Sequence, residues 1–159
     1  MLFETPGCES YLSAAILDPE TLYQKSDTSA DKCFPQVLSD KGIVPGVKVH
    51  LKVYTLPGTN GDTVMQGLDS LNARCKEYYQ AVARFAKWRS PLVTDMDKGR
   101  PAALAICANM QDLARYALIC QSEGLMPIVE PDISLSGTHT RAGYTCQHFR
   151  PVGALQGHD

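Results

Sequence analysis

The chain alternates short apolar runs with longer segments in which apolar residues recur every three or four positions. Four runs have the length of a strand, and the second of them is rich in Val and Ile and opens with a glycine. We predict strands over residues 11–17 (YLSAAIL), 42–50 (GIVPGVKVH), 84–89 (RFAKWR) and 126–133 (MPIVEPDI).

Two segments between these runs have the period of an amphipathic helix. The first covers residues 67–79 and the second residues 101–124, where Pro101 suits a first helical turn and Gly124 suits a carboxyl-terminal cap. The stripes expected to be buried are Leu68, Leu71, Cys75 and Tyr78 in the first helix, and Leu113, Ala117 and Cys120 or Leu118 in the second. Strands and helices that alternate at this spacing predict an α/β fold with parallel strands joined by right-handed crossovers.

Length and charge narrow the class of protein. A chain of 159 residues with 44% apolar content suits a single domain with one core. The net charge of -2 and the absence of a Lys/Arg cluster argue against a nucleic-acid partner. No apolar run has the length of a membrane span, and the first ten residues do not resemble a signal peptide. We therefore expect a cytoplasmic protein without a membrane partner.

The cysteines and loops do not predict a metal or a cofactor. The six cysteines are scattered without a C-x-x-C pair, so we expect free, mostly buried thiols rather than disulfides or a zinc site. His139, Cys146 and His148 match no common metal-site spacing. Residues 55–63 (TLPGTNGDT) contain an Asn-Gly turn but neither of the glycine-rich phosphate-binding motifs. From Ser134 onward the sequence loses any strand or helix period, and we expect an irregular tail over 134–159 after a folded region over 1–133.

The third predicted strand carries two cations within an aromatic, apolar run. Because alternate residues of a strand face opposite ways, Phe85, Lys87 and Arg89 share one face, while Ala86 and Trp88 share the other. One face is therefore apolar and bulky, and the other is charged.

The neighbouring strands repeat this arrangement. In residues 46–50, Lys48 and His50 face away from Val47 and Val49. In residues 128–132, Glu130 and Asp132 face away from Val129. Parallel strands that end in inward-facing charged groups are typical of the carboxyl-terminal mouth of a (β/α) barrel, where catalytic residues lie. Lysines and carboxylates in such a mouth alter one another's pKa values and favour acid–base chemistry. The alternative is a solvated sheet edge with ion pairs and no catalytic role.

Several segments together resemble the class I fructose-bisphosphate aldolases, metal-independent enzymes that form a Schiff base on a TIM (β/α)8 barrel. The resemblance runs from about Leu2 to Ile133, and it implies a partial barrel with roughly strands two to five. The segments that carry it are residues 5–27 (TPGCESYLSAAILDPETLYQKSD), 41–50 (KGIVPGVKVH), 56–79 (LPGTNGDTVMQGLDSLNARCKEYY), 85–89 (FAKWR) and 113–133 (LARYALICQSEGLMPIVEPDI).

The resemblance implies a role for each charged residue. Lys87 is similar to the family's lysine that contacts substrate and assists carbinolamine formation, and Arg89 to its neighbour in the substrate-binding set. Lys48 is similar to the phosphate-side lysine. Glu130 is similar to the general acid/base carboxylate, with Asp132 as the second carboxylate of that motif. No cofactor or metal is implied, the substrate is a sugar phosphate, and the family commonly forms homo-oligomers.

The sequence also departs from the family pattern. His50 stands where the family has an aspartate, Asp132 is shorter than the usual glutamate, and residues 79–84 (YQAVAR) lack the glycine of the family's corresponding link. The family's Schiff-base lysine on strand six has no counterpart here. Its strand-one aspartate and its later phosphate-binding loops correspond to positions before Met1 and after Asp159.

Two functions are therefore open. In the first, the chain represents a fructose-bisphosphate aldolase of glycolysis and gluconeogenesis, whose missing segments belong to a longer form. In the second, it is a truncated, non-catalytic binding fragment that associates with intact aldolase subunits or other partners through open strand edges. A dinucleotide-binding dehydrogenase is less favoured, because no glycine fingerprint follows a strand.

Overall fold

A four-stranded parallel sheet forms the centre of the computed structural model, which describes residues 2–29 and 31–134. All four predicted strands are present and their neighbours run parallel, as expected. The order is β1-β2-β5-β6, so β1 and β6 are the outer strands of this sheet among the residues described. The strands are β1 (Ala14–Leu17), β2 (Val44–Lys48), β5 (Phe85–Leu92) and β6 (Met126–Ile133).

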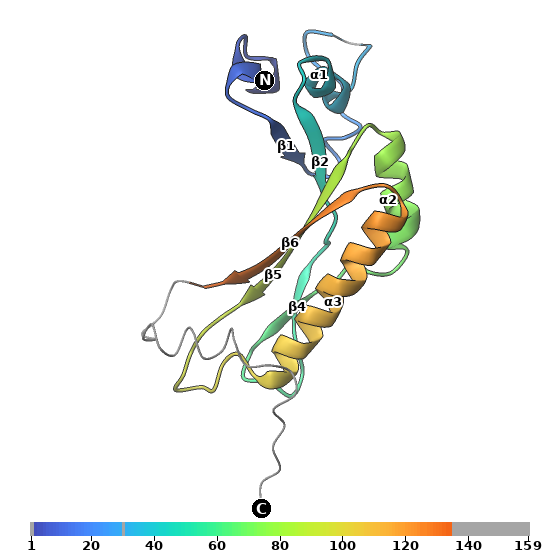
Figure 1. Cartoon of the computed structure of the whole chain (residues 1–159). Helices are drawn as coiled ribbons and strands as arrows, with labels where there is room; N and C mark the ends of the chain where they lie inside the picture. Colours follow the sequence, from blue (N-terminus) through green and yellow to red (C-terminus); the bar gives the residue numbers. More distant parts are fainter. Residues whose placement is uncertain (1, 30, 135–159) are drawn as a thin grey trace, which may run out of the picture.

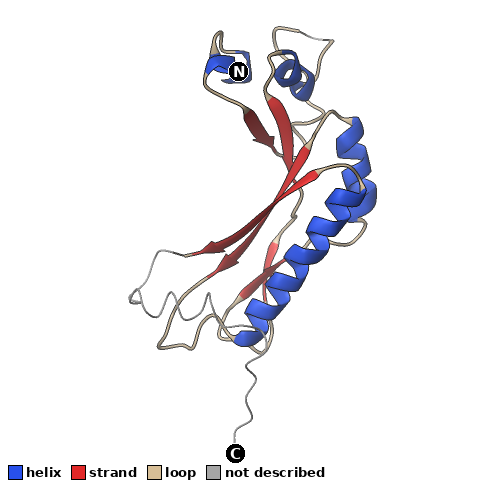
Figure 2. Cartoon of the chain, viewed as in Figure 1, coloured by secondary structure: helices blue, strands red, loops and turns tan. Residues whose placement is uncertain are grey.

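Both predicted helices are present and lie on one side of the sheet (Figure 1). They are α2 (Leu71–Gln80) and α3 (Ala103–Ser122). The other side of the sheet has no helix from the described part of the chain over it (Figure 2). The core lies between the sheet and these helices. Its main members are Val47, Ala86 and Trp88 from the strands, Val49 just after β2, and Leu71, Cys75, Leu113, Tyr116 and Cys120 from the helices.

Helix α3 follows the predicted pattern except at its start. The prediction of Pro101 in the first turn was wrong, because the helix begins at Ala103 with Ala102 as its N-cap. Gly124 adopts a φ of 81° just after the helix ends, as a carboxyl-terminal cap requires. Of the two alternatives for the stripe, Cys120 is buried and Leu118 is 67% exposed. The buried face also includes Tyr116, whose hydroxyl donates to the carbonyl oxygen of Ala86 at 2.7 Å. This bond fixes the helix to the start of β5.

Five short elements lie outside the sequence prediction. Three of them are the seven-residue helix α1 (Phe34–Asp40) and the two strands of a hairpin, β3 (Val53–Thr55) and β4 (Thr63–Met65). The hairpin loop contains the Asn-Gly sequence, for which only a turn was predicted. Each of these elements is too short to show a period. Two single-turn 3-10 helices, Leu2–Glu4 and Cys8–Ser10, precede β1.

Asp62 fixes the hairpin to the loop before α3. It is 2% exposed and accepts hydrogen bonds from Arg100 Nε at 3.0 Å and from the backbone N–H of Ala102 at 2.8 Å. A buried carboxylate requires such partners, since an unpaired charge is costly to remove from water.

Gly46 allows close packing on the uncovered face of the sheet. It is the register partner of Phe85, and a Cβ atom at residue 46 would lie 2.3 Å from the Phe85 ring. The ring therefore lies flat across β2 at this point. Other apolar side chains of this face remain open to solvent, with Ile16 45%, Val44 43% and Met126 63% exposed.

Three further expectations concern the cysteines, membrane spans and the tail. The five cysteines within the described residues are all free of disulfides, as predicted, but only Cys75 and Cys120 are buried. The expectation of mostly buried thiols is therefore met for a minority of them. Among the helices described, none has the length and apolar content to cross a bilayer. The predicted irregular tail lies outside the described residues except for Ser134, and so do His139, Cys146 and His148.

Candidate active site

The predicted charged residues lie together on the face of the sheet that the helices leave open. Lys48 is the last residue of β2, but Lys87 and Arg89 lie within β5, because this strand continues to Leu92 rather than ending at Arg89 as predicted. Lys48 ends β2 and is the register partner of Lys87 on β5. Arg89 is the register partner of Glu130 on β6. The opposite faces of these strands hold buried Val47, Ala86 and Trp88, so the alternation expected from the sequence is observed. The fold thus brings the predicted site residues together as one group. These are Lys48, Lys87, Arg89, Glu130 and Asp132.

The two cations of β5 each bind a carboxylate of β6. Lys87 Nζ lies 2.5 Å from an Oε atom of Glu130. Arg89 donates from Nε to an Oδ atom of Asp132 at 2.5 Å, and its Nη2 contacts the same oxygen. In each pair the carboxylate lies two residues further along β6 than the register partner of the cation. The pairs therefore run diagonally across the two strands, and they orient both lysine and arginine side chains.

Lys48 has a partner that the sequence analysis did not identify. Its Nζ forms an ion pair with Asp18, the residue that follows β1. Leu17 is the register partner of Val47, so Asp18 lies level with Lys48. The signal was present in the sequence, because Asp18 directly follows an apolar run and has the same parity as Ile16. The two adjacent lysines of β2 and β5 consequently have separate carboxylate partners.

His50 lies beside this group, just beyond the end of β2. Its Nδ1 accepts a hydrogen bond from the backbone N–H of Arg89 at 3.3 Å. Its ring meets that of Trp88 edge to face, with centroids 6.1 Å apart, although Trp88 belongs to the helix-covered face. Strand alternation therefore does not describe the His50 side chain, because β2 ends at Lys48.

Burial and charge both act on His50. Partial burial of the imidazole lowers the pKa of His50 below its ordinary value, and the positive charges of Lys48, Lys87 and Arg89 lower it further, while Asp18 opposes them. With Nδ1 occupied as an acceptor, a neutral imidazole carries its proton on Nε2. His50 thus adds a hydrogen-bond donor rather than a fourth cation near neutral pH.

The group has the composition needed for acid–base chemistry on an anionic ligand. Its cations can bind phosphate or steady a developing oxyanion, and its carboxylates can transfer protons. Across residues 2–29 and 31–134, no three His, Cys, Asp or Glu side chains are placed to hold a metal ion. A solvated edge would also form ion pairs, so the geometry alone is compatible with both interpretations of these charges.

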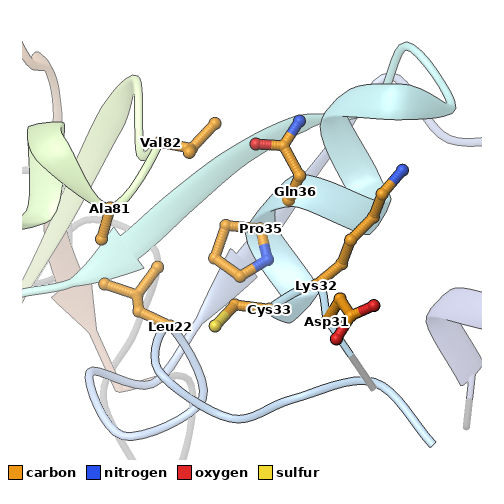
Figure 3. Close-up of a pocket in the computed structure, with 8 residues that line it drawn as sticks. All are labelled: Leu22, Asp31, Lys32, Cys33, Pro35, Gln36, Ala81 and Val82. Atoms are coloured by element: carbon orange, nitrogen blue, oxygen red, sulfur yellow. The ribbon is translucent and has the colours of Figure 1, made fainter. Parts of the chain in front are cut away.

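Two pockets lie away from the charged group. One of about 280 Å³ is lined by Leu22, residues 31–33, Pro35, Gln36, Ala81 and Val82 (Figure 3). The other, of about 470 Å³, is lined by Tyr23, Glu77, Gln80 and Ala81. Neither lining includes a residue of the ion pairs, and the sequence analysis assigned no role to these positions.

Comparisons with known proteins show which family this chain is similar to. The chain is 52% identical over 139 residues to the cytosolic fructose-bisphosphate aldolase 5 of Arabidopsis thaliana, and equally to the cytoplasmic isozyme of Spinacia oleracea. Each alignment covers 87% of this chain and 38% of the relative. The chain thus spans less than half the length of these relatives.

A solved structure gives the same result for the fold. It is a ternary structure of fructose-bisphosphate aldolase from Plasmodium falciparum in complex with TRAP and a small-molecule inhibitor. The two chains superpose with a TM-score of 0.82 at 46% identity, over 87% of this chain and 39% of that one. This likeness confirms the predicted fold class, an α/β chain that forms part of a TIM barrel.

A match between this chain and a family model identifies the family. The description of the matching family is "Glycolytic: Fructose-bisphosphate aldolase class-I", and the match covers residues 1–149. It includes every residue of the three ion pairs. Since the match extends over far more than half of its 159 residues, this chain belongs to the class I fructose-bisphosphate aldolase family.

Proposed function

We propose that this chain forms part of the active site of a fructose-bisphosphate aldolase, a lyase of glycolysis and gluconeogenesis. The reaction is the reversible cleavage of fructose 1,6-bisphosphate to dihydroxyacetone phosphate and glyceraldehyde 3-phosphate by a Schiff-base mechanism. The observation that carries the proposal is the group of three cation–carboxylate pairs on the open face of adjacent parallel strands, in a chain of this family. The names of its plant relatives support a cytosolic location.

The β5–β6 pairs supply the proton-handling part of the site. Glu130 is the general acid/base that exchanges a proton during formation and dehydration of the carbinolamine. The Nζ atom of Lys87 lies 2.5 Å from a carboxylate oxygen of Glu130. Lys87 stabilises the negative charge of this carboxylate, and then the charge on the substrate oxygen when Glu130 is protonated. Asp132 assists by holding Arg89 in a fixed orientation at 2.5 Å.

The cations supply substrate binding. Arg89, Lys87 and Lys48 face the uncovered side of the sheet, where an anionic sugar phosphate can approach without displacing the helices. Each is only partly exposed, since between 29% and 52% of each side chain is accessible. Partial burial strengthens the attraction between such cations and a phosphate group. The substrate class is therefore an anionic sugar phosphate.

The Schiff-base lysine that the family resemblance implies has no counterpart among these residues. In this proposal, the Schiff-base step uses a lysine of a longer form of the polypeptide or of an associated subunit. In a form of the protein that has this lysine, Glu130→Gln should slow turnover strongly and leave substrate binding largely intact. Unchanged turnover would remove Glu130 from the mechanism.

The 159-residue chain itself can be tested for binding. Lys87→Met should weaken the affinity for fructose 1,6-bisphosphate by about tenfold, because one charge-assisted hydrogen bond contributes about 1.5 kcal/mol. Lys32→Met is the matched control, since Lys32 pairs with Asp40 far from the strand ends. Equal affinities for the two variants would exclude the proposed site.

The open edges of the sheet favour a second candidate function. β1 and β6 have no further neighbour among the described strands, and Ile16, Val44 and Met126 are exposed beside them. Such a surface suits a non-catalytic fragment that associates with intact aldolase subunits or forms a homo-oligomer. Borohydride reduction of the protein purified from its source, in the presence of fructose 1,6-bisphosphate, separates the two functions. A trapped triose phosphate adduct on a polypeptide that contains these residues would exclude the non-catalytic fragment, and a native polypeptide of 17.4 kDa without an adduct would exclude the aldolase.

A further inference from the structure

The charges on the open face of the sheet cancel because of one residue outside the assigned site. We define the open-face cluster as Asp18, Lys48, Lys87, Arg89, Glu130 and Asp132, which form three ion pairs. Its three cations and three carboxylates leave no net charge. Without Asp18, the cluster would carry one positive charge toward an incoming phosphate.

Asp18 differs from the other two carboxylates in its position. Glu130 and Asp132 both come from β6, and both bind cations of β5. Asp18 comes from the end of β1, at the opposite side of the sheet, and its partner is Lys48. It therefore does not take part in the proton-handling pairs, and it acts on the one cation that is assigned to a phosphate group.

The Asp18–Lys48 pair is also the most accessible of the three. The two side chains are 54% and 41% exposed, against 33% and 29% for Glu130 and Lys87. Exposed ion pairs contribute little stability, so a ligand can displace Asp18 from Lys48 at low cost. The displaced carboxylate nevertheless stays close to the bound anion, because β1 and β2 are neighbours in fixed register. It therefore repels a phosphate group that occupies Lys48.

We propose that Asp18 is a specificity-determining residue, which competes with ligand phosphate for Lys48 and so lowers the preference of the site for doubly phosphorylated sugars. The proposal rests on the proposed function for the choice of ligand, and it deepens that function by assigning a charge selection to one residue. A bisphosphate that presents a phosphate to Lys48 meets the Asp18 carboxylate. A singly phosphorylated sugar can bind with that phosphate elsewhere and avoid it.

Asp18→Asn keeps the size of the side chain and removes its charge. The variant should bind fructose 1,6-bisphosphate about two- to fivefold more tightly, the range that corresponds to the measured energies of exposed charge pairs. Fructose 6-phosphate should gain less. The gain should shrink as salt is added, because exposed charges are screened.

The experiment is an NMR titration of the full 159-residue chain at low, fixed ionic strength, followed through the backbone amides of residues 44–49. The ligands are fructose 1,6-bisphosphate, fructose 6-phosphate and inorganic phosphate. Asp40→Asn is the matched control, because Asp40 is also an exposed carboxylate paired with a lysine but lies outside the cluster. In a Lys48→Met background, the effect of Asp18→Asn should disappear if it acts through Lys48.

The outcomes separate this proposal from the proposed function. Tighter binding of inorganic phosphate by Asp18→Asn, with no advantage for either sugar, would support the role of Asp18 and contradict the sugar-phosphate site. Binding of fructose 1,6-bisphosphate at equal affinity by the wild type, Asp18→Asn and Asp40→Asn would support the site and overturn the role of Asp18. Amides that respond to none of the ligands in any variant would overturn both.

Discussion

Val82 adopts a backbone conformation that β-branched residues rarely occupy, and glycine at this position should relieve the strain. Its φ is 74°, in the left-handed region, where the Cβ atom lies too close to backbone atoms. Val82 follows the end of α2 and directly precedes the segment that leads into β5. It falls within residues 79–84, the link in which the family resemblance implies a glycine. The chain therefore carries the strain that this glycine would avoid.

The magnitude follows from two opposing terms. A residue with a Cβ atom pays about 1–2 kcal/mol for the left-handed conformation. Glycine loses about 0.5–1 kcal/mol through the greater freedom of the unfolded chain. The Val82 side chain also lines the pocket of Figure 3 and is partly buried, so its methyl groups contribute separately. Val82→Ala removes these methyl groups and keeps the strain, which makes it the proper reference.

We expect Val82→Gly to be more stable than Val82→Ala by about 0.5–1 kcal/mol. Ala81→Gly is the matched control at the adjacent residue, where φ is -79° and glycine brings no relief. This control should be less stable than the wild type by about 0.5–1 kcal/mol. The two glycine substitutions, one residue apart, should therefore act in opposite directions.

Urea unfolding followed by tryptophan fluorescence measures both effects. Trp88 is the only tryptophan of the chain and is 0% exposed, so its emission reports on the core between β5 and α3. The slope of the unfolding free energy against urea must stay constant for the midpoints to be compared. If Val82→Gly proved less stable than Val82→Ala, the strain argument would be wrong.

Three further predictions concern the hairpin, the imidazole and the close contact in the sheet. Asp62→Ala should destabilise the chain by about 3 kcal/mol in urea unfolding, since it leaves the buried charge of Arg100 without this carboxylate, and a loss below about 1 kcal/mol would contradict a buried pair. NMR titration should give a pKa of His50 below the ordinary histidine value. The free energy of unfolding should then fall as the pH drops from the ordinary pKa to the lowered one, because only the unfolded chain gains the proton in that range. This pH dependence should be absent in His50→Asn. Gly46→Ala should lower the free energy of unfolding by about 1–3 kcal/mol through its clash with the Phe85 ring. Gly46→Ala combined with Phe85→Leu should lower it by less than the sum of the two single changes. Strict additivity would exclude the clash.

The local elements of this chain could be predicted because their signals lie within a few consecutive residues. The alternation of Phe85, Lys87 and Arg89 with Ala86 and Trp88 determines the charged face of β5, since successive side chains of any strand point in opposite directions. Helices α2 and α3 are long enough to repeat their apolar period. The family resemblance then predicted the barrel topology into which these elements fit, which the likeness to a solved aldolase confirms.

The choice of partners was decided only by the tertiary structure. Asp18 and Lys48 are far apart in sequence, and nothing in either segment states that β1 and β2 lie side by side with these residues level. Likewise, strand parity alone cannot show that Lys87 binds Glu130. Ion pairs depend on strand order and register, which arise from packing the whole sheet against its helices. The sequence therefore determined which residues carry charge. The fold determined how these charges balance on the open face of the sheet.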